Sequence, residues 1–266
     1  MSRYLLTFVL GCLTTVSGPV IYGANEMQET VGRMKQTVDG QQLQYLLQVP
    51  QGEPPEDGWP LLMFLHGYGE CGNNIQLVKV HGPPKLTDRF DHLSKCIIVS
   101  PQCPKNSWWR VRALRALLQE LQNDRTDIDE SRRYLTGLSM GGYGTWSYLS
   151  NFPNDFAAAI PICGGGNPLL ISSAVVPDKS GVRNEFSTEG LQQAAHVPVH
   201  TFHGARDAAI PVTESEHIVW LLKHAGSKSV QLTTYEQSGH IGAWQRAYRS
   251  QELWNWLFEQ RLATAN

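Results

Sequence analysis

The sequence predicts an α/β protein whose mostly parallel, twisted sheet carries helices on both faces. Three observations support this expectation. Apolar runs of strand length alternate with segments that have apolar residues at helical spacing. Glycine-containing turns follow several of the apolar runs directly. One of these turns, Gly137-Leu138-Ser139-Met140-Gly141, places a serine where a strand meets a helix.

The expected sheet begins at its edge. Residues 31–38 and 43–49 predict an antiparallel pair of strands, and the acidic, proline-rich stretch 50–60 separates this pair from the central strands. The continuous apolar runs at 61–65 and 97–99 have the composition of strands that are buried on both faces. Such strands occur in the centre of a parallel sheet.

The rest of the chain continues the alternation. Leucines at helical spacing predict a helix at 111–121, whose apolar side would pack on one face of the sheet. The later expected elements are a strand at 134–136, a helix at 143–149, strands at 198–202 and 230–235, and helices at 213–224 and 243–258. Parallel strands bring their carboxyl ends to one edge of the sheet, so we expect a binding site at that edge.

Ser139 is the candidate nucleophile. A tight strand-to-helix turn crowds the backbone against the residues two before and two after the serine, and Gly137 and Gly141 have no Cβ atoms to collide. The helix that comes next directs its first N–H groups and the positive end of its dipole toward the same corner. A negative charge that develops at this corner is therefore favoured.

Candidates for the acid and the base occur later in chain order. Asp207 lies in the turn after the strand at 198–202, and His240 lies in a glycine-containing loop after the strand at 230–235. Asp178 is a competing acid, but it belongs to an irregular stretch rather than to a strand end. The order serine, acid, histidine is the one expected when an α/β scaffold carries a Ser-His-Asp triad.

A fourth turn supplies the expected oxyanion hole. The strand at 61–65 runs into His66-Gly67-Tyr68-Gly69-Glu70, a turn of the type whose backbone N–H groups stabilise a tetrahedral intermediate. We expect the N–H groups of Tyr68 and of Met140, the residue after the nucleophile, to form the hole.

Six stretches of the chain carry a family resemblance when they are taken together. They are L-H-G-Y-G-E at 65–70, S-P-Q-C-P-K-N-S-W-W at 100–109, Y-L-T-G-L-S-M-G-G-Y-G-T-W at 134–146, F-A-A-A-I-P-I-C-G-G-G at 156–166, F-H-G-A-R-D at 202–207 and G-H at 239–240. The chain resembles the α/β-hydrolase superfamily, and within it the esterases and predicted peptidases related to the prolyl oligopeptidase catalytic domain, feruloyl esterases and polyhydroxybutyrate depolymerases. The resemblance implies Ser139 as nucleophile with Asp207 and His240 as its relay, and it implies no cofactor.

One stretch departs from these relatives. Where they pass quickly from the C-G-G-G motif to the strand before the acid, this chain inserts residues 167–196, which show little periodicity. The insertion is either a lid over the site or a surface excursion that packs on the body of the domain.

Four further side chains have both a structural and a functional interpretation. Trp108 and Trp109 either bind substrate in an aromatic pocket or pack in the core. His66 and His203 each precede a glycine at a strand end, and we expect them to brace their loops by hydrogen bonds rather than to transfer protons.

Length and composition indicate a single catalytic domain over residues 25–266. The chain has 266 residues, of which 41% are hydrophobic and 17% are charged, and its net charge is -2. Basic residues are scattered rather than clustered, which excludes an electrostatic attraction to nucleic acid. The expected partner is a small-molecule ester.

The first 24 residues predict an export signal, and hence a periplasmic or extracellular protein. Arg3 precedes an apolar stretch at 4–16, which is short for a membrane span of about 20 residues. The spacing of cysteine and histidine residues does not indicate a metal site. Removal of the signal leaves four cysteines, which permit up to two disulfides without requiring them: Cys71, Cys96, Cys103 and Cys163.

Three functions are compatible with the sequence. The first is a serine carboxylesterase that cleaves small or aromatic acyl esters, such as feruloyl or acetyl esters, through an acyl-enzyme. The second is a serine peptidase of the prolyl oligopeptidase type. The third is a non-catalytic binding protein on a hydrolase scaffold, and the complete set of triad residues argues against it.

Overall fold

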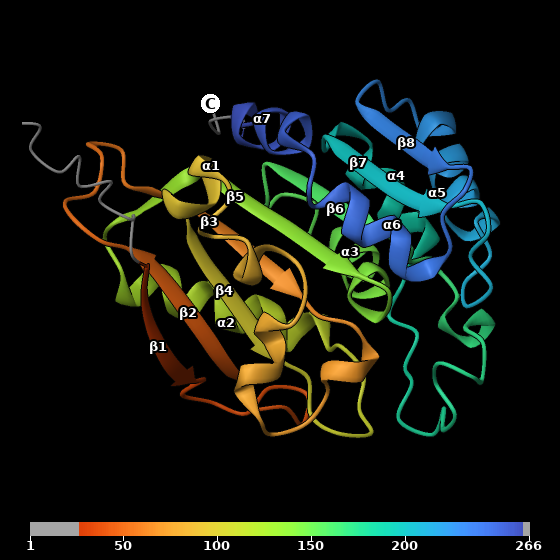
Figure 1. Cartoon of the computed structure of the whole chain (residues 1–266), viewed down its shortest axis with the longest axis horizontal. Helices are drawn as coiled ribbons and strands as arrows, with labels where there is room; N and C mark the ends of the chain where they lie inside the picture. The colour runs from red at the N-terminus through yellow and green to blue at the C-terminus, as the bar shows by residue number, and fades with distance from the viewer. Residues whose placement is uncertain (1–26, 263–266) are drawn as a thin grey trace, which may run out of the picture.

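The computed structural model describes residues 27–262, which form an eight-stranded sheet (Figure 1). The strand order is β1-β2-β4-β3-β5-β6-β7-β8. Only β1/β2 and β2/β4 pair antiparallel within this sheet. The strands are β1 (Met27–Arg33), β2 (Gln44–Pro50), β3 (Trp59–Leu65), β4 (Ile97–Gln102), β5 (Ile128–Leu138), β6 (Ala158–Ile162), β7 (Val199–Gly204) and β8 (Val230–Tyr235).

Two hydrophobic clusters show that side chains of the central strands alternate between the two faces of the sheet. In β3, Leu61, Met63 and Leu65 belong to one cluster, and Leu62 and Phe64 belong to the other. All five side chains are fully buried. This strand is apolar without interruption because both of its faces are covered.

The helices divide between the same two clusters (Figure 1). On the Leu61 face lie α2 (Val111–Asp124), α3 (Met140–Asn151) and α5 (Thr213–His224), and on the Leu62 face lie α1 (Asp91–Ser94), α6 (His240–Ala247) and α7 (Gln251–Glu259). The predicted architecture, a mostly parallel sheet of the α/β-hydrolase type with helices on both faces, is confirmed.

Two element boundaries differ from those expected. Strand β1 ends at Arg33 rather than reaching residue 38. Beyond it, Val38 and Gln41 form only an isolated bridge across the turn at Asp39 and Gly40, whose φ angles are 48° and 75°. The single helix expected at 243–258 is two helices. The Ser250 hydroxyl starts the second by accepting a hydrogen bond from the N–H of Leu253 at 3.1 Å.

The segment 167–196 is attached to the domain at several points. Ile171 and Val176 are buried in the cluster on the Leu61 face. The Glu185 carboxylate accepts hydrogen bonds from the N–H of Val111 at 2.8 Å and from Arg110 at 3.2 Å, at the start of α2. The short helix α4 (Thr188–Gln193) ends the segment against α3 and α5.

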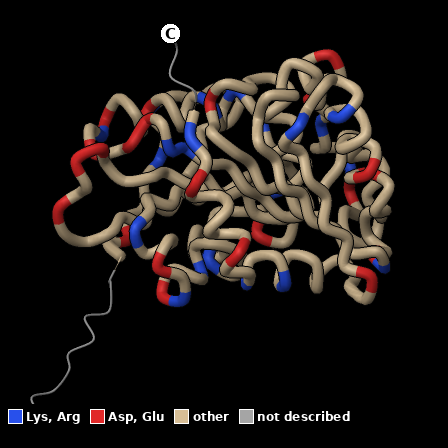
Figure 2. Tube along the Cα trace, turned by 90° about the horizontal axis from the view of Figure 1, so that it is seen from above, with Lys and Arg blue, Asp and Glu red and all other residues tan. Residues whose placement is uncertain are grey.

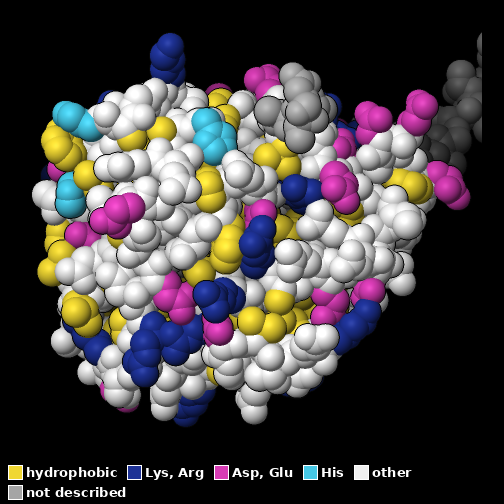
Figure 3. All heavy atoms as spheres, turned by 180° about the vertical axis from the view of Figure 1, so that it is seen from behind, with side chains coloured by type: hydrophobic (Ala, Val, Ile, Leu, Met, Phe, Trp, Pro, Cys, Tyr) yellow, Lys and Arg dark blue, Asp and Glu magenta, His cyan; other side chains and the backbone are white. Residues whose placement is uncertain are grey.

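Along the Cα trace, the positions of basic and acidic residues are interspersed around the molecule (Figure 2). On the back face, hydrophobic side chains gather only in small groups between polar and charged ones (Figure 3). Within residues 27–262, no helix has both the length and the apolar character needed to cross a bilayer. The expected export signal at 1–24 lies outside the described residues.

The four cysteines at issue are all free thiols: Cys71, Cys96, Cys103 and Cys163. Burial raises the pKa of the Cys96 and Cys163 thiols far above their usual range, so both behave as small apolar side chains.

Candidate active site

The nucleophile candidate stands between β5 and α3. Ser139 follows the last residue of β5 and precedes Met140, the first residue of α3, and its φ is 55°. This left-handed conformation is uncommon for a residue with a Cβ atom. It is held from both sides, because Ser139 N–H donates to Ile162 O at 2.9 Å and Ser139 O accepts from Tyr143 N–H at 3.1 Å.

Two glycines make this corner sterically possible. A Cβ atom on Gly137 would lie 2.3 Å from the carbonyl oxygen of Gly141, and one on Gly141 would lie 1.9 Å from the carbonyl oxygen of Leu65. Both distances are far shorter than any van der Waals contact. The spacing of glycines around Ser139 is therefore a packing requirement of β3, β5 and α3.

His240 lies within hydrogen-bonding distance of this serine. It is the first residue of α6, directly after the loop that follows β8, and its Nε2 is 2.8 Å from Ser139 Oγ. The ring of Trp244, one turn later, packs edge-on against the imidazole with 4.9 Å between ring centroids. The histidine is thus oriented by its own helix.

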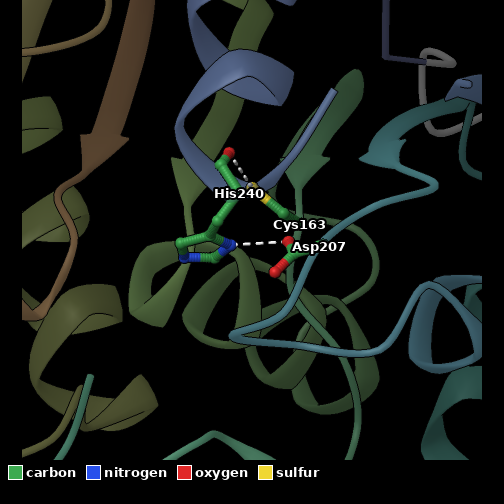
Figure 4. A group of neighbouring side chains, drawn as sticks. All are labelled: Cys163, Asp207 and His240. Atoms are coloured by element: carbon green, nitrogen blue, oxygen red, sulfur yellow. Dashed lines mark hydrogen bonds and ion pairs between the residues drawn. The ribbon is translucent and has the colours of Figure 1, made fainter. Parts of the chain in front are cut away.

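Asp207 completes the series. It lies in the loop after β7, and its Oδ2 is 2.6 Å from Nδ1 of His240 (Figure 4). Oδ1 accepts hydrogen bonds from the N–H groups of Ala209 at 2.8 Å and Ile210 at 2.9 Å. The side chain is fully buried.

The charge on Asp207 is maintained despite this burial. Burial alone would raise the pKa of the carboxyl, but hydrogen bonds from His203 and His240, and from the amide of Ile210, hold the pKa well below its usual range. An ionised Asp207 accepts a hydrogen bond from Nδ1–H of His240 and so leaves Nε2 free to accept the hydroxyl proton of Ser139.

Cys163 lies beside this pair and raises the question of a metal site. Its thiol, Asp207 and His240 offer ligand atoms within 4.8 Å of one another (Figure 4). Two ligands of one tetrahedral zinc stand roughly 3.3 Å apart, whereas Nδ1 and Oδ2 here are 2.6 Å apart. The pair is arranged as a hydrogen bond. The Cys163 thiol donates instead to the carbonyl oxygen of His240 at 3.8 Å.

The two expected oxyanion donors lie on adjacent elements. Tyr68 opens a 3-10 turn (Tyr68–Glu70) directly after β3, and Met140 opens α3. Neither N–H donates to another group of the described residues. The position that a Cβ of Gly67 would occupy is 3.7 Å from Ser139 Cβ, so the turn runs directly beside the nucleophile.

One protein-family model matches this region of the chain. The model of the prolyl oligopeptidase family aligns with residues 109–262, which is more than half of the chain and includes Ser139, Asp207 and His240. The chain belongs to the prolyl oligopeptidase family. The match does not extend to the turn at Tyr68.

Two curated relatives of this family member are named as a depolymerase and a probable esterase. The chain is 24% identical to a poly(3-hydroxyoctanoate) depolymerase of Pseudomonas fluorescens, over 72% of each chain. It is 26% identical to a protein of Aspergillus terreus named "Probable feruloyl esterase C", over 74% of this chain and 79% of the relative.

Solved structures show the same fold. A thermostable esterase is 31% identical with a TM-score of 0.67, over 90% of this chain and 64% of that one. An acylaminoacyl peptidase of Pyrococcus horikoshii is 17% identical with a TM-score of 0.64, over 92% of this chain and 43% of that one. The chain thus spans less than two thirds of both solved chains. This prolyl oligopeptidase family member is a hydrolase of the esterase or peptidase type.

In this family member, the turn that is expected to form the oxyanion hole, called the oxyanion turn below, is tied to the end of β4 by the side chains of His66 and Gln102. His66 Nε2 accepts a hydrogen bond from Cys103 N–H at 3.0 Å, so its proton is on Nδ1, which donates to Gly67 O at 2.6 Å. Gln102 Nε2 donates to Glu70 O at 2.8 Å. Burial lowers the pKa of His66 to about 4, so the ring is neutral near pH 7. His66 braces the loop, as its sequence position indicates.

Gln102 was not predicted from the sequence. The available signal is a polar amide at the end of the apolar strand Ile97–Gln102, where a buried polar side chain needs a specific partner. The position of Cys163 beside Asp207 was also not predicted from the sequence.

The structure places the remaining candidates away from the reacting atoms. Trp108 and Trp109 are 2% and 1% exposed, and they pack in the core under the site, with the ring of Trp109 against His66 at 4.8 Å. Asp178 accepts a hydrogen bond from Ser180 N–H at 2.9 Å in the segment 167–196, whereas Asp207 is the acid that contacts His240.

Proposed function

We propose that this hydrolase cleaves carboxylic esters through an acyl-enzyme formed on Ser139. The observation that carries the proposal is the continuous hydrogen-bonded series from Ser139 Oγ to His240 at 2.8 Å and from His240 to Asp207 at 2.6 Å. A serine, a histidine and a buried carboxylate in this arrangement form a nucleophile, its base and the group that orients the base.

In the acylation step, Ser139 Oγ attacks the ester carbonyl carbon while Nε2 of His240 accepts the hydroxyl proton. Asp207 accepts the Nδ1 hydrogen bond and stabilises the imidazolium that forms. When the tetrahedral intermediate collapses, His240 donates its Nε2 proton to the leaving alcohol oxygen. The products of this half-reaction are the free alcohol and the acyl group on Ser139 Oγ.

Deacylation repeats these proton transfers with water. His240 Nε2 accepts a proton from the water molecule whose oxygen attacks the acyl carbon, and then returns a proton to Ser139 Oγ. The free acid leaves and the starting state is restored.

The N–H groups of Tyr68 and Met140 are proposed to receive the oxyanion in both steps. Their free state and their position on two elements beside Ser139 support this role. The N-terminus of α3 adds its positive dipole end at the same place. Loss of one such donor typically costs about 3 kcal/mol of transition-state stabilisation.

Ester hydrolysis is proposed over peptide hydrolysis because of the names of the relatives that align along most of this chain. These are a poly(3-hydroxyoctanoate) depolymerase and a probable feruloyl esterase, aligned over 72% and 74% of this chain. We propose residues 25–266 as one catalytic domain and small or aromatic acyl esters, including feruloyl and acetyl esters, as substrates.

The segment 167–196 is proposed to form one wall of the substrate site. Asp178 in this segment contributes to the raised pKa of the Tyr68 phenol, after the larger effects of burial and of Cys71. The segment is also tied to the loop of the acid, since Ser172 N–H donates to Ala209 O at 2.9 Å. It thus borders both halves of the site.

The testing experiment compares p-nitrophenyl acetate, methyl ferulate and a peptide amide side by side, with the Ser139→Ala variant as the blank. Ester turnover that this variant loses, with little amide turnover, is the expected result. Dominant amide turnover would favour the peptidase. Failure of a fluorophosphonate probe to label the wild-type protein would favour the non-catalytic binding protein.

We further propose that the protein is exported. The N-terminal sequence supports this, as does a relative named "Uncharacterized secreted protein" from Arthroderma benhamiae, 28% identical over 36% of this chain and 11% of the relative. Mass spectrometry of the mature N-terminus after expression with residues 1–24 in place tests the proposal, and retention of these residues would contradict it.

A further inference from the structure

A second histidine contacts the carboxylate of Asp207. His203 lies in β7, four residues before Asp207, and its side chain is fully buried. Its Nε2 is 3.3 Å from Oδ2 of Asp207, the same oxygen that lies 2.6 Å from Nδ1 of His240. One carboxylate oxygen is thus shared by two imidazoles.

The surroundings of His203 determine which nitrogen carries a proton. Nε2 also lies 3.0 Å from the carbonyl oxygen of Ile210. Both neighbours of Nε2 are acceptors, so Nε2 must be the donor. Nδ1 is 2.8 Å from the hydroxyl of Ser215 in α5. Contacts at both nitrogens therefore fix the ring, and its Nε2–H donates to Ile210 O while it also lies beside Oδ2 of Asp207.

His203 is the last of the polar groups that surround the carboxylate of Asp207. Oδ1 of Asp207 accepts two backbone hydrogen bonds, from Ala209 and Ile210, and Oδ2 accepts a hydrogen bond from His240 and lies 3.3 Å from Nε2 of His203. Next to burial, the hydrogen bond from His203 has the largest effect on the pKa of Asp207, and it lowers that pKa.

We propose that His203 is a positioning residue that sets how strongly Asp207 holds the base His240. The proposal rests on the proposed ester hydrolysis and deepens it. Negative charge on Oδ2 is shared between two N–H donors, so each donor is held less strongly than it would be alone. Without His203, the carboxylate attracts the imidazolium form of His240 more strongly.

Other titratable groups around Asp207 do not replace this donor. Burial raises the pKa of the Cys163 thiol, and the charge on Asp207 raises it further, so this group is neutral. Burial also raises the pKa of the Tyr143 phenol in α3, with smaller effects of Glu214 and Asp207. Glu214 in α5 accepts a hydrogen bond from Asn167 N–H at 3.0 Å. Arg206, the chain neighbour of Asp207, is exposed.

The experiment compares the pH dependence of kcat/KM for wild type, His203→Leu and His203→Gln. Leucine removes the donor at similar volume, whereas the glutamine amide nitrogen takes nearly the place of Nε2. In His203→Leu we expect the acidic limb of the profile to move up by about 0.5 to 1 pH unit. His203→Gln should move it less and so rescue the wild-type profile in part.

Thr201→Val is the matched control. Thr201 is fully buried two residues earlier in β7, and its hydroxyl donates to Pro161 O at 2.8 Å without any contact to Asp207. It should lower the melting temperature without moving the acidic limb. An unchanged limb in folded His203→Leu, or an equal shift in Thr201→Val, would overturn the proposal.

A second readout separates this proposal from the proposed function. NMR titration of the labelled His240 ring reports its protonation whether or not a substrate is turned over. If the wild type hydrolyses no ester, the function fails while the titration still tests His203. If His203→Leu does not fold, Ser215→Ala removes the partner of Nδ1, and we expect a smaller shift in the same direction. No shift there would contradict the proposal.

Discussion

The two halves of the site are built differently. Around the acid and base, Asp207 is held by hydrogen bonds of 2.6 to 2.9 Å that come from His240 and from its own loop. In the oxyanion turn, the internal backbone bonds are longer, 3.4 Å from Glu70 N–H and 3.3 Å from Cys71 N–H. The turn depends instead on His66 and Gln102.

This difference shows where each half is vulnerable. The acid loop carries most of its own hydrogen-bond partners, so changes outside it should act weakly on its geometry. Contacts with the end of β4 hold the oxyanion turn in place. Substitutions at the end of β4 should therefore lower turnover although they alter no group that is proposed to react.

The largest expected effect comes from removing the proposed nucleophile. Ser139→Ala should lower kcat by about 10⁶, because the three side chains act as a unit. Single-turnover ester hydrolysis and fluorophosphonate labelling measure the loss. Ser147→Ala, a buried serine of the same helix, is the control and should keep most activity. Substantial turnover by Ser139→Ala would contradict the assignment.

The next effect tests the acid half. Asp207→Asn should lower kcat by about 10⁴, since a neutral amide neither fixes the tautomer of His240 nor stabilises its cation. Asp178→Asn is the control, because Asp178 is the competing acid in the sequence and does not contact His240. Steady-state kinetics of both variants, with circular dichroism to verify folding, measure the difference. A larger loss in Asp178→Asn would reverse the choice of acid.

A third prediction concerns how His66, which holds the oxyanion turn, affects the stability of the protein at low pH. Burial lowers the pKa of His66 from 6.5 to about 4. Between these values the unfolded chain binds a proton that the folded chain does not, so stability falls as pH decreases from 6.5 to 4 and levels off below. The loss attributable to His66 approaches about 3 kcal/mol. Urea unfolding at pH 7 and pH 4.5 measures it.

A second histidine titrates in the same range and needs its own control. Burial also lowers the pKa of His200 to about 4. His66→Gln should remove the fall in unfolding free energy that is due to His66. His200→Gln should leave that fall in place. Equal pH dependence in His66→Gln and wild type would refute the role of His66 in acid sensitivity.

The smallest expected effect tests the support of the oxyanion turn. Gln102→Met removes the donor to Glu70 O and to Asn74 O, and we expect kcat to fall about tenfold with little change in KM. Ser100→Ala is the control on the same strand, because its buried hydroxyl has no hydrogen-bond partner among the described residues. Equal kcat in the two variants would show that the turn does not depend on β4.

Much of the fold was predictable because burial and close packing leave patterns in short stretches of the sequence. The uninterrupted apolar run of β3 follows from burial on both faces of the sheet. The Gly137 and Gly141 pattern follows from close packing around Ser139. The boundary between α6 and α7 was not predicted. The Ser250 N-cap begins α7 without interrupting the apolar spacing of the sequence.

The sequence by itself determined the strand-to-helix corner at Ser139 and the strand ends that carry Asp207 and His240, because steric and periodic patterns act over a few residues. Only the tertiary structure decided that Asp207 rather than Asp178 meets His240. The same is true of the burial of Trp108 and Trp109, and of the shared contact of His203 with the acid. Contacts between side chains far apart in sequence depend on strand order and register, which no local pattern specifies.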